Sequence, residues 1–224
     1  MIIQSSHVCK LQADYNRANL ALDLPEIHLD FDPEIYPNYE SPLLFKSEQG
    51  LEWRSVNFGL IPKWVHDKAD VKFTYNARNE TLLEKTSFQE SFQKFKFGVI
   101  AVSEFYEMKY INGRAQRWGV RRKDGKGFFI AALYEIVKIG DQIIRSATMI
   151  TMDAIDHEMM REFHEPGDVK RSVVIIPHNR LDEWLSLKTT DIQTFIQGFP
   201  VDEFECFYCP KPSKNINPNQ LGFF

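Results

Sequence analysis

The sequence predicts an α+β fold in which a curved, mostly antiparallel β-sheet or barrel is surrounded by peripheral helices. Three observations lead to this fold class. Short apolar runs rich in β-branched and aromatic residues recur along the chain, with turn-forming residues between them. Only a few segments have the apolar spacing of a helix. The 224 residues contain no internal repeat and no low-complexity segment, so we expect residues 1–224 to form a single domain.

The first half of the chain is predicted to contain two helices, a hairpin and an extended segment. Residues 14–24 are expected to form a short helix that ends before a proline. Residues 43–45 and 51–56 are apolar runs on either side of a turn that ends in glycine, which predicts a hairpin. Residues 71–78 are expected to be extended. Residues 87–90 have the form of a capping box, and three phenylalanines at helical spacing predict an amphipathic helix there.

The second half is predicted to be richer in strands. The Val-Ile-Ala-Val run at residues 99–102 is typical of a buried strand. Two hairpins are expected next, because each pair of apolar runs surrounds a turn that contains glycine. The predicted elements are strands 116–121 and 127–134, strands 136–139 and 143–152, a helix at 157–163, a strand at 172–176, and a helix at 179–187 with Leu181 and Trp184 facing the core.

Composition excludes several classes of protein. Apolar residues make up 43% of the chain and charged residues 26%, which is ordinary for a globular domain. No apolar run approaches the roughly 20 residues that a membrane helix needs, and the N-terminus has no secretory pattern. Three cysteines do not form a disulfide framework, so we expect a cytoplasmic protein. The net charge of −4 requires any nucleic-acid site to be a local basic patch.

The segment after residues 99–102 is the first candidate for chemistry. Glu104 and Glu107, with two aromatic residues between them, follow the predicted strand closely. If strand alternation continues, Phe105 and Glu107 share one face, so that Glu107 lies beside apolar surface. Loss of water at such a place raises a carboxyl pKa toward the range of a general acid. The alternative is a solvated acid at the end of a strand.

Other features also have both a functional and a structural interpretation. Arg78 suits either a phosphate clamp or a solvated loop. His164 is either a catalytic group or a surface or capping residue. Residues 114–126 hold six basic residues and one acid, which suits either a nucleic-acid groove or a solvated face. Cys206 and Cys209 have the spacing of a zinc pair, but no second pair exists, so we expect no metal.

Several motifs, taken together and in order, resemble one protein family over roughly residues 36–184. The matching segments are Phe-Gly-Leu-Ile-Pro-Lys-Trp at 58–64, Asn-Ala-Arg-Asn-Glu-Thr at 76–81, Phe-Tyr-Glu at 105–107, Phe-Ile-Ala-Ala-Leu-Tyr-Glu at 129–135, residues 148–151, and His164 with the strand that ends at Pro177. They resemble the SOS response-associated peptidase (SRAP) family, the abasic-site processing proteins. Each motif alone is weak, whereas the ordered set is specific.

The resemblance implies a compact, mostly antiparallel α+β fold with a narrow positive cleft for single-stranded DNA that contains abasic sites. It implies that a cysteine exposed as the first residue links covalently to the abasic site. By resemblance, Asn76 positions the sugar, Glu107 moves protons near the amine, and His164 assists ring opening. The implied DNA-binding residues are Arg78 on a flanking phosphate, Trp64 and Pro37 as wedges between bases, Thr151 in the groove, and Arg171 after the histidine.

The residue types suit the chemistry that the resemblance implies. An abasic sugar opens to an aldehyde, and an α-amine with a pKa of about 8 is partly neutral at physiological pH and attacks it. The neighbouring thiol then closes a five-membered thiazolidine ring, and only an N-terminal cysteine offers amine and thiol at that spacing. We expect no cofactor, a monomer, and a cytoplasmic location that becomes nucleoid-associated on DNA. Peptidase activity on the protein's own N-terminus and lyase activity at abasic sites are also implied.

The chain departs from the family at its N-terminus. The family's cysteine is normally residue 2, whereas here residue 2 is Ile2 and the first cysteine is Cys9, preceded by Val8. We expect residues 1–8 to be an extension or a mis-assigned start. Cys9 becomes the first residue if Val8 is the initiator, which we favour, or if the Cys9 thiol attacks the preceding carbonyl. The alternatives are a non-covalent single-stranded DNA-binding protein and a thiol autopeptidase without DNA chemistry.

Overall fold

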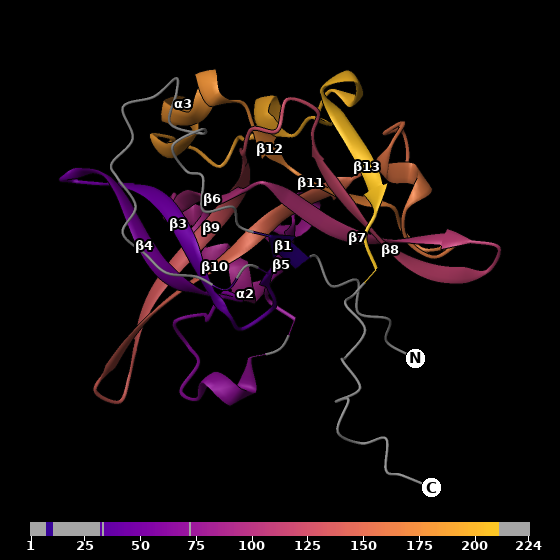
Figure 1. The fold of residues 1–224 in the computed structure, drawn as a ribbon. Helices are drawn as coiled ribbons and strands as arrows, with labels where there is room; N and C mark the ends of the chain where they lie inside the picture. Colours follow the sequence, from indigo (N-terminus) through magenta and orange to yellow (C-terminus); the bar gives the residue numbers. More distant parts are fainter. Residues whose placement is uncertain (1–7, 11–31, 33, 72, 211–224) are drawn as a thin grey trace, which may run out of the picture.

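Two β-sheets make up most of the domain, and two short α-helices lie at its periphery (Figure 1). The computed structural model describes residues 8–10, 32, 34–71 and 73–210, and for residues 8–10 it describes the backbone. The α-helices are α2 (Thr86–Gln93) and α3 (Leu181–Leu185). The 3-10 helices are Lys68–Asp70, Asn79–Thr81, Met160–Glu162, His178–Arg180, Gln193–Phe195 and Val201–Glu203.

The larger sheet closes on itself as a ring of five strands. In this ring β10 pairs with β4, β4 with β3, β3 with β6, β6 with β9, and β9 again with β10. The pairing of β10 with β4 is parallel and the other four are antiparallel, and ring closure leaves these strands without free edges. The ring strands are β3 (Glu40–Ser47), β4 (Gly50–Phe58), β6 (Phe97–Val102), β9 (Phe128–Ile139) and β10 (Gln142–Asp153). Three short strands add to them: β5 (Asn76–Arg78), β11 (Arg171–Val173) and β12 (Ile175–Ile176).

The second sheet is antiparallel and has the order β13-β8-β7-β1-β2. Its strands are β1 (Val8–Lys10), β2 (Glu34–Ile35), β7 (Glu104–Ile111), β8 (Arg114–Arg122) and β13 (Phe204–Tyr208). Only Ser103 separates β6 from β7, so the chain passes directly from the ring into the second sheet. The polar segment predicted to follow a buried strand is therefore the start of another strand. The turn after it begins at Asn112.

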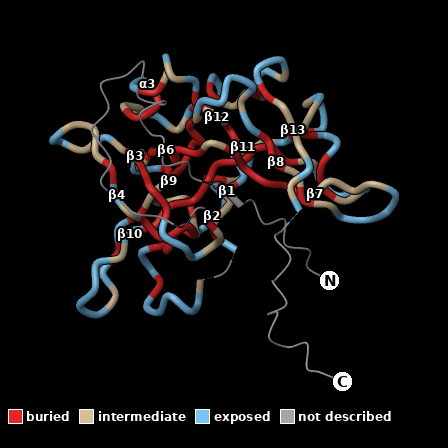
Figure 2. The backbone as a smooth tube through the Cα atoms, in the orientation of Figure 1, coloured by how far each residue is buried: buried red, intermediate tan, exposed pale blue. Residues whose placement is uncertain are grey.

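The core fills the ring and the space between the two sheets, and the exposed residues gather at the hairpin ends (Figure 2). Every residue of β6 is buried, as the Val-Ile-Ala-Val run predicted. The helix α2 packs Phe88 and Phe92 inward, and Phe92 meets Phe97 edge to face with ring centroids 5.8 Å apart. These contacts confirm the apolar helix face predicted after residue 87.

The helix α3 anchors one end of the ring. It is shorter than the predicted helix at 179–187, but Leu181 and Trp184 face the core as expected, with 1% and 0% of their surface exposed. The indole Nε1 of Trp184 donates to the Gly98 carbonyl oxygen at 2.9 Å. A Cβ at residue 98 would lie 2.9 Å from Leu43 Cδ1 and 3.1 Å from the Leu44 carbonyl oxygen, so any larger residue would force these neighbours to shift.

The fold class and most strands agree with the prediction, including the hairpins at 43–56 and 136–152. The hairpin predicted for residues 116–121 and 127–134 is wrong. There β8 pairs with β7 and β13, whereas β9 pairs with β6, β10 and β12, so the turn between them connects the two sheets. Turn residues specify a local change of direction and leave the partners of the flanking strands to the packing of the core.

Two predicted helix features are also wrong. Ser87 lies inside α2, and the N-cap position is Lys85, which makes no side-chain capping hydrogen bond, so there is no capping box. The helix predicted at 157–163 is reduced to the 3-10 turn Met160–Glu162. Its backbone instead turns toward β7 at the next residues, where tertiary pairing outweighs helix propensity.

The predicted strand at 172–176 is interrupted at Val174. The Val174 N–H donates to Ile150 O at 3.0 Å and its carbonyl accepts from Ala131 N–H at 2.8 Å, so this residue bridges β10 and β9 while the chain moves from one to the other. The helix predicted at 14–24 lies outside the described residues. No helix in the described part of the chain is long and apolar enough to cross a membrane.

Removing the Trp184 side chain should destabilise the domain strongly. Trp184→Ala loses a fully buried indole and its hydrogen bond to Gly98, and we expect a loss of about 3–5 kcal/mol in the free energy of unfolding, measured with urea. Trp64→Ala is the matched control: its side chain is 58% exposed, so the change should stay within about 0.5 kcal/mol. Equal stability of the two variants would contradict the assigned core.

Candidate functional site

Glu107 is a carboxylate held inside the protein. Only 2% of the residue is exposed, so the alternative of a solvated strand-end acid is excluded. Glu107 lies two residues after Phe105 on β7, so the two side chains share one face of the strand. Phe105 packs edge to face against Phe128 and Phe199, with ring centroids 6.3 Å apart in both cases. Glu107 Oε1 accepts the Met108 N–H at 3.1 Å. A buried carboxylate needs such partners, because losing water costs free energy.

His164 lies beside this carboxylate. Its Nε2 is 3.7 Å from Glu107 Oε2, and 7% of the residue is exposed. The His164 backbone adopts a φ of 66°, a left-handed conformation that non-glycine residues rarely adopt. Its N–H donates to Met108 O at 2.7 Å, which ties the loop to β7. The sequence-predicted pair of Glu107 and His164 is therefore brought together in the fold.

The backbone of Cys9 lies in β1, between β7 and β2. Its register partners are Phe105 on β7 and Ile35 on β2. Because β1 and β7 are antiparallel, the step along β7 from Phe105 to Glu107, about 7 Å, runs toward the N-terminal side of Cys9. The register thus places the backbone nitrogen of Cys9 toward the part of β7 that carries Glu107.

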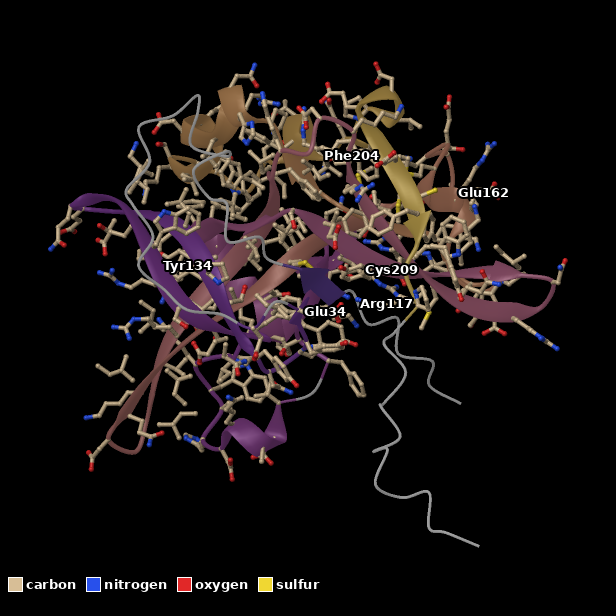
Figure 3. The ribbon with its side chains drawn as sticks, in the orientation of Figure 1. Glu34, Arg117, Tyr134, Glu162, Phe204 and Cys209 are labelled. Atoms are coloured by element: carbon tan, nitrogen blue, oxygen red, sulfur yellow. The ribbon has the colours of Figure 1, made fainter. Side chains whose placement is uncertain are left out.

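A partly buried ion pair braces β1 between its neighbours. Arg117 on β8 donates to Glu34 on β2 at 2.7 Å, across β7 and β1. The guanidinium also stacks 3.6 Å above the Tyr106 ring, and the Tyr106 hydroxyl donates to Glu104. Burial and then the Glu104 carboxylate raise the pKa of Tyr106, so it stays protonated. Figure 3 shows Glu34, Arg117 and Cys209 together beside β1. Sequence analysis missed this bracing role.

Asn76 lies on β5. Of the extended segment predicted at 71–78, only Asn76–Arg78 forms a strand, and Asn76 is paired with Met149 of β10. The preceding residue, Tyr75, has a pKa above its ordinary value because of burial and then because of the Glu107 charge. This interaction locates the start of β5 close to Glu107. The sequence contained no signal for Tyr75, since only the tertiary fold brings it there.

Arg78, Thr151 and Arg171 form a second group. Arg78 is exposed and lies opposite Thr151 in the pairing of β5 with β10. The Arg171 guanidinium binds both Glu80 oxygens, at 2.8 and 3.0 Å, and donates to Thr151 Oγ1 at 3.0 Å. Burial tends to raise the pKa of Glu80, but the hydrogen bonds and charge of Arg171 outweigh it and hold that pKa below 4.5. Sequence analysis did not identify Glu80 as the group that orients Arg171.

Pro37 and Trp64 lie on separate loops. Asn38, next to Pro37, donates its N–H to Phe58 O at 2.6 Å. Trp64 projects into solvent, and its Nε1 lies 3.5 Å from Thr86 O at the start of α2. Two more aromatic residues that the sequence analysis did not select, Tyr39 and Phe73, are 45% and 54% exposed. Exposed rings of this kind can stack on unpaired bases.

Three of the six basic residues at 114–126 are paired with acids. Arg117 binds Glu34, Arg121 binds Glu205, and Arg122 binds both Asp124 and Glu203. Such pairing reduces the positive potential that a nucleic-acid groove needs. The structure therefore favours the interpretation of this run as a braced sheet surface.

A cavity of about 370 Å³ lies among the described residues but belongs to another part of the domain. Its lining includes none of Asn76, Glu107 and His164. Its lining includes Phe128, Ile176, His178, Arg180, Phe195, Phe199 and Phe204. Within the described residues, no group of three or more His, Cys, Asp or Glu side chains is placed to hold a metal ion, and Cys206 and Cys209 are free thiols.

The fold and site together define a mostly β domain with a buried carboxylate–imidazole pair beside the strand that carries its first cysteine. A family model described as SOS response associated peptidase (SRAP) matches residues 8–215. The chain therefore belongs to the SRAP family, as its ordered motifs indicated.

Relatives with assigned names support this membership. The abasic site processing protein YoqW of Bacillus subtilis (strain 168) is 30% identical over 157 residues, which are 68% of this chain and 66% of the relative. The abasic site processing protein YMR114C of Saccharomyces cerevisiae is 30% identical over 119 residues, 50% of this chain and 32% of the relative.

Solved structures share the fold. A crystal structure of a Bordetella bronchiseptica protein matches with a TM-score of 0.84 at 25% identity, over 91% of this chain and 99% of the other. A Bacteroides thetaiotaomicron protein matches with a TM-score of 0.74 at 20% identity, over 91% and 92% of the two chains.

The pair of Glu80 and Arg171 should make stability depend on pH. The folded-state pKa of Glu80 is depressed, so its contribution is present above its ordinary pKa of 4.5 and disappears as the pH falls through the lower folded value. Glu80→Gln should lower the free energy of unfolding by about 1–2 kcal/mol at neutral pH, a value reduced for the partial exposure of Glu80. Urea unfolding should show the difference from wild type shrinking as the pH falls below the ordinary pKa of 4.5.

The matched control is Glu183→Gln, because Glu183 makes a similar two-point contact with Arg180 at the surface. It should change stability much less than Glu80→Gln. A pH-independent effect of Glu80→Gln would show that its ionised form is not what stabilises the fold.

Proposed function

We propose that this protein binds single-stranded DNA and forms a covalent thiazolidine crosslink with abasic sites through Cys9 once that residue is N-terminal. The observation that carries the proposal is the buried pair of Glu107 and His164, 3.7 Å apart, on the part of β7 toward which the Cys9 nitrogen lies. The names of the relatives support abasic sites as the substrate.

The reaction has two bond-forming steps. The neutral α-amine of Cys9 attacks the aldehyde carbon of the opened sugar, and the resulting carbinolamine loses water to give an imine. The Cys9 sulfur then adds to the imine carbon while the nitrogen takes up a proton, so one water leaves in total and no oxidant is required. Glu107 takes the amine proton and returns it to the leaving hydroxyl, and His164 assists opening of the closed sugar.

The DNA would follow the surface formed by β5, β10 and the loops next to them. Asn76 would contact the sugar, and Arg78, exposed beside Thr151, would contact a flanking phosphate. Arg171 is held in place by Glu80, which offsets its charge, and would contribute a guanidinium of fixed orientation to the groove. Trp64 and Pro37 would separate neighbouring bases. We further propose that the protein acts as a cytoplasmic monomer that joins the nucleoid on DNA, and that its peptidase activity is limited to its own N-terminus.

Crosslinking should depend on Glu107 and His164. With a single-stranded oligonucleotide that contains one abasic site, wild-type protein should give a band that survives a denaturing gel. Glu107→Gln keeps the shape but cannot transfer the proton, so the rate should fall by roughly 10²–10⁴-fold. His164→Ala should lower the rate of crosslinking to the closed sugar more than the rate of crosslinking to a pre-opened aldehyde. An oligonucleotide with a reduced abasic site, which has no aldehyde, is the substrate control.

Wild-type rates in both variants would place the chemistry on other residues. Salt-sensitive DNA binding without any covalent product would favour the non-covalent binding protein. Slower reaction on duplex than on single-stranded DNA is the expected order of substrates.

The mature chain should begin at Cys9, because an amide nitrogen cannot attack an aldehyde as an amine does. The family match that starts at residue 8 supports this. The gene would be expressed from its native upstream region and the N-terminus determined by mass. Cys9 first in both wild type and Glu107→Gln supports initiation at Val8, whereas an uncut chain only in the variant supports self-cleavage. A chain that keeps residues before Cys9 and still crosslinks would refute the Cys9 mechanism.

A further inference from the structure

Lys170 makes an unusual set of contacts beneath the His164 loop. Its ammonium Nζ lies 2.8 Å from Phe163 O, 3.3 Å from His164 O and 3.1 Å from Glu165 O. An ammonium has three donors, and three consecutive carbonyl oxygens accept them. Hydrogen bonds from a charged donor are stronger than neutral ones. Lys170 therefore clamps the loop that carries the imidazole.

The loop needs this support because its backbone is strained. His164 has a φ of 66°, and its backbone N–H donates to Met108 O at 2.7 Å. A non-glycine residue in this conformation costs free energy and persists only where its surroundings hold it. The Lys170 contacts act on the carbonyl side of the same residue, opposite the contact with Met108.

Lys170 itself is anchored to the ring. Its carbonyl accepts the Ala154 N–H at 3.0 Å. The next residue, Arg171 of β11, pairs with Asp153 of β10. Lys170 thus connects the end of β10 to the loop at residues 163–165. Because all its donors are directed at carbonyl oxygens, none remains for a DNA phosphate. We therefore do not expect Lys170 to bind DNA.

We propose that Lys170 is a positioning residue, whose three hydrogen bonds hold the His164 backbone in the left-handed conformation that directs the imidazole to Glu107. This inference rests on the proposed function for its effect on rate. Six residues, 165–170, separate His164 from Arg171, so this loop must be held in register. Displacement of a catalytic group by about 1 Å can cost about 10²-fold in rate.

The test compares three variants on the abasic oligonucleotide. Lys170→Met should leave DNA affinity within about twofold and slow crosslinking of the closed sugar by roughly 10–100-fold, with a smaller effect on a pre-opened aldehyde. Lys170→Arg, which keeps a charged donor, should recover part of the rate. The matched control is Lys123→Met, because Lys123 also donates to a backbone carbonyl, Asp202 O at 2.8 Å, but makes this contact away from the His164 loop.

A second measurement does not depend on the reaction. The NMR signals of the His164 imidazole, assigned by their loss in His164→Ala, should shift in Lys170→Met and stay unchanged in Lys123→Met. If wild type forms no crosslink, the proposed function fails, while these signals still decide whether Lys170 holds the histidine. The inference is overturned if the His164 signals and the rate both match wild type in Lys170→Met, or if DNA affinity falls as much as the rate does.

Discussion

The burial of the Glu107 carboxylate on β7 is the constraint on which the rest of the site depends. A carboxylate at 2% exposure must be compensated by hydrogen bonds and nearby polar groups. Its surroundings meet that need from several directions: the Met108 N–H reaches one oxygen, and His164 lies beside the other. The two contacts come from different parts of the chain, so the site forms only when the fold is complete.

The connection between the two sheets explains how this place arises. Only Ser103 separates β6, buried along its whole length in the ring, from β7, which leaves the ring for the second sheet. β7 therefore begins in the core and has β8 on one side and β1 on the other. The ion pair of Arg117 with Glu34 spans these strands and fixes β1 against β7. The same short connection thus positions both Glu107 and the backbone of Cys9.

Local sequence patterns predicted the strands and the core side of the helices, because alternation and helical spacing report directly on burial. They misassigned the turn at 123–126, since a Lys-Asp-Gly-Lys turn is the same whether it joins partners in one sheet or strands of two. Glu107 and His164 were found through their motifs. Tyr75, Glu80 and Lys170 were missed, because each acts through a contact that only the tertiary fold creates.

The distances within the charged pairs separate two kinds of pair. Arg117 with Glu34 and Arg171 with Glu80 close to 2.7 and 2.8 Å, as expected where the pair itself holds strands together. His164 and Glu107 stay 3.7 Å apart, beyond direct hydrogen-bonding distance. The backbone of His164 is contacted by Met108 on one side and by Lys170 on the other. Under the proposed function, this separation would let both groups exchange protons with a third that approaches along β7, and the register of β1 places the nitrogen of Cys9 in that direction.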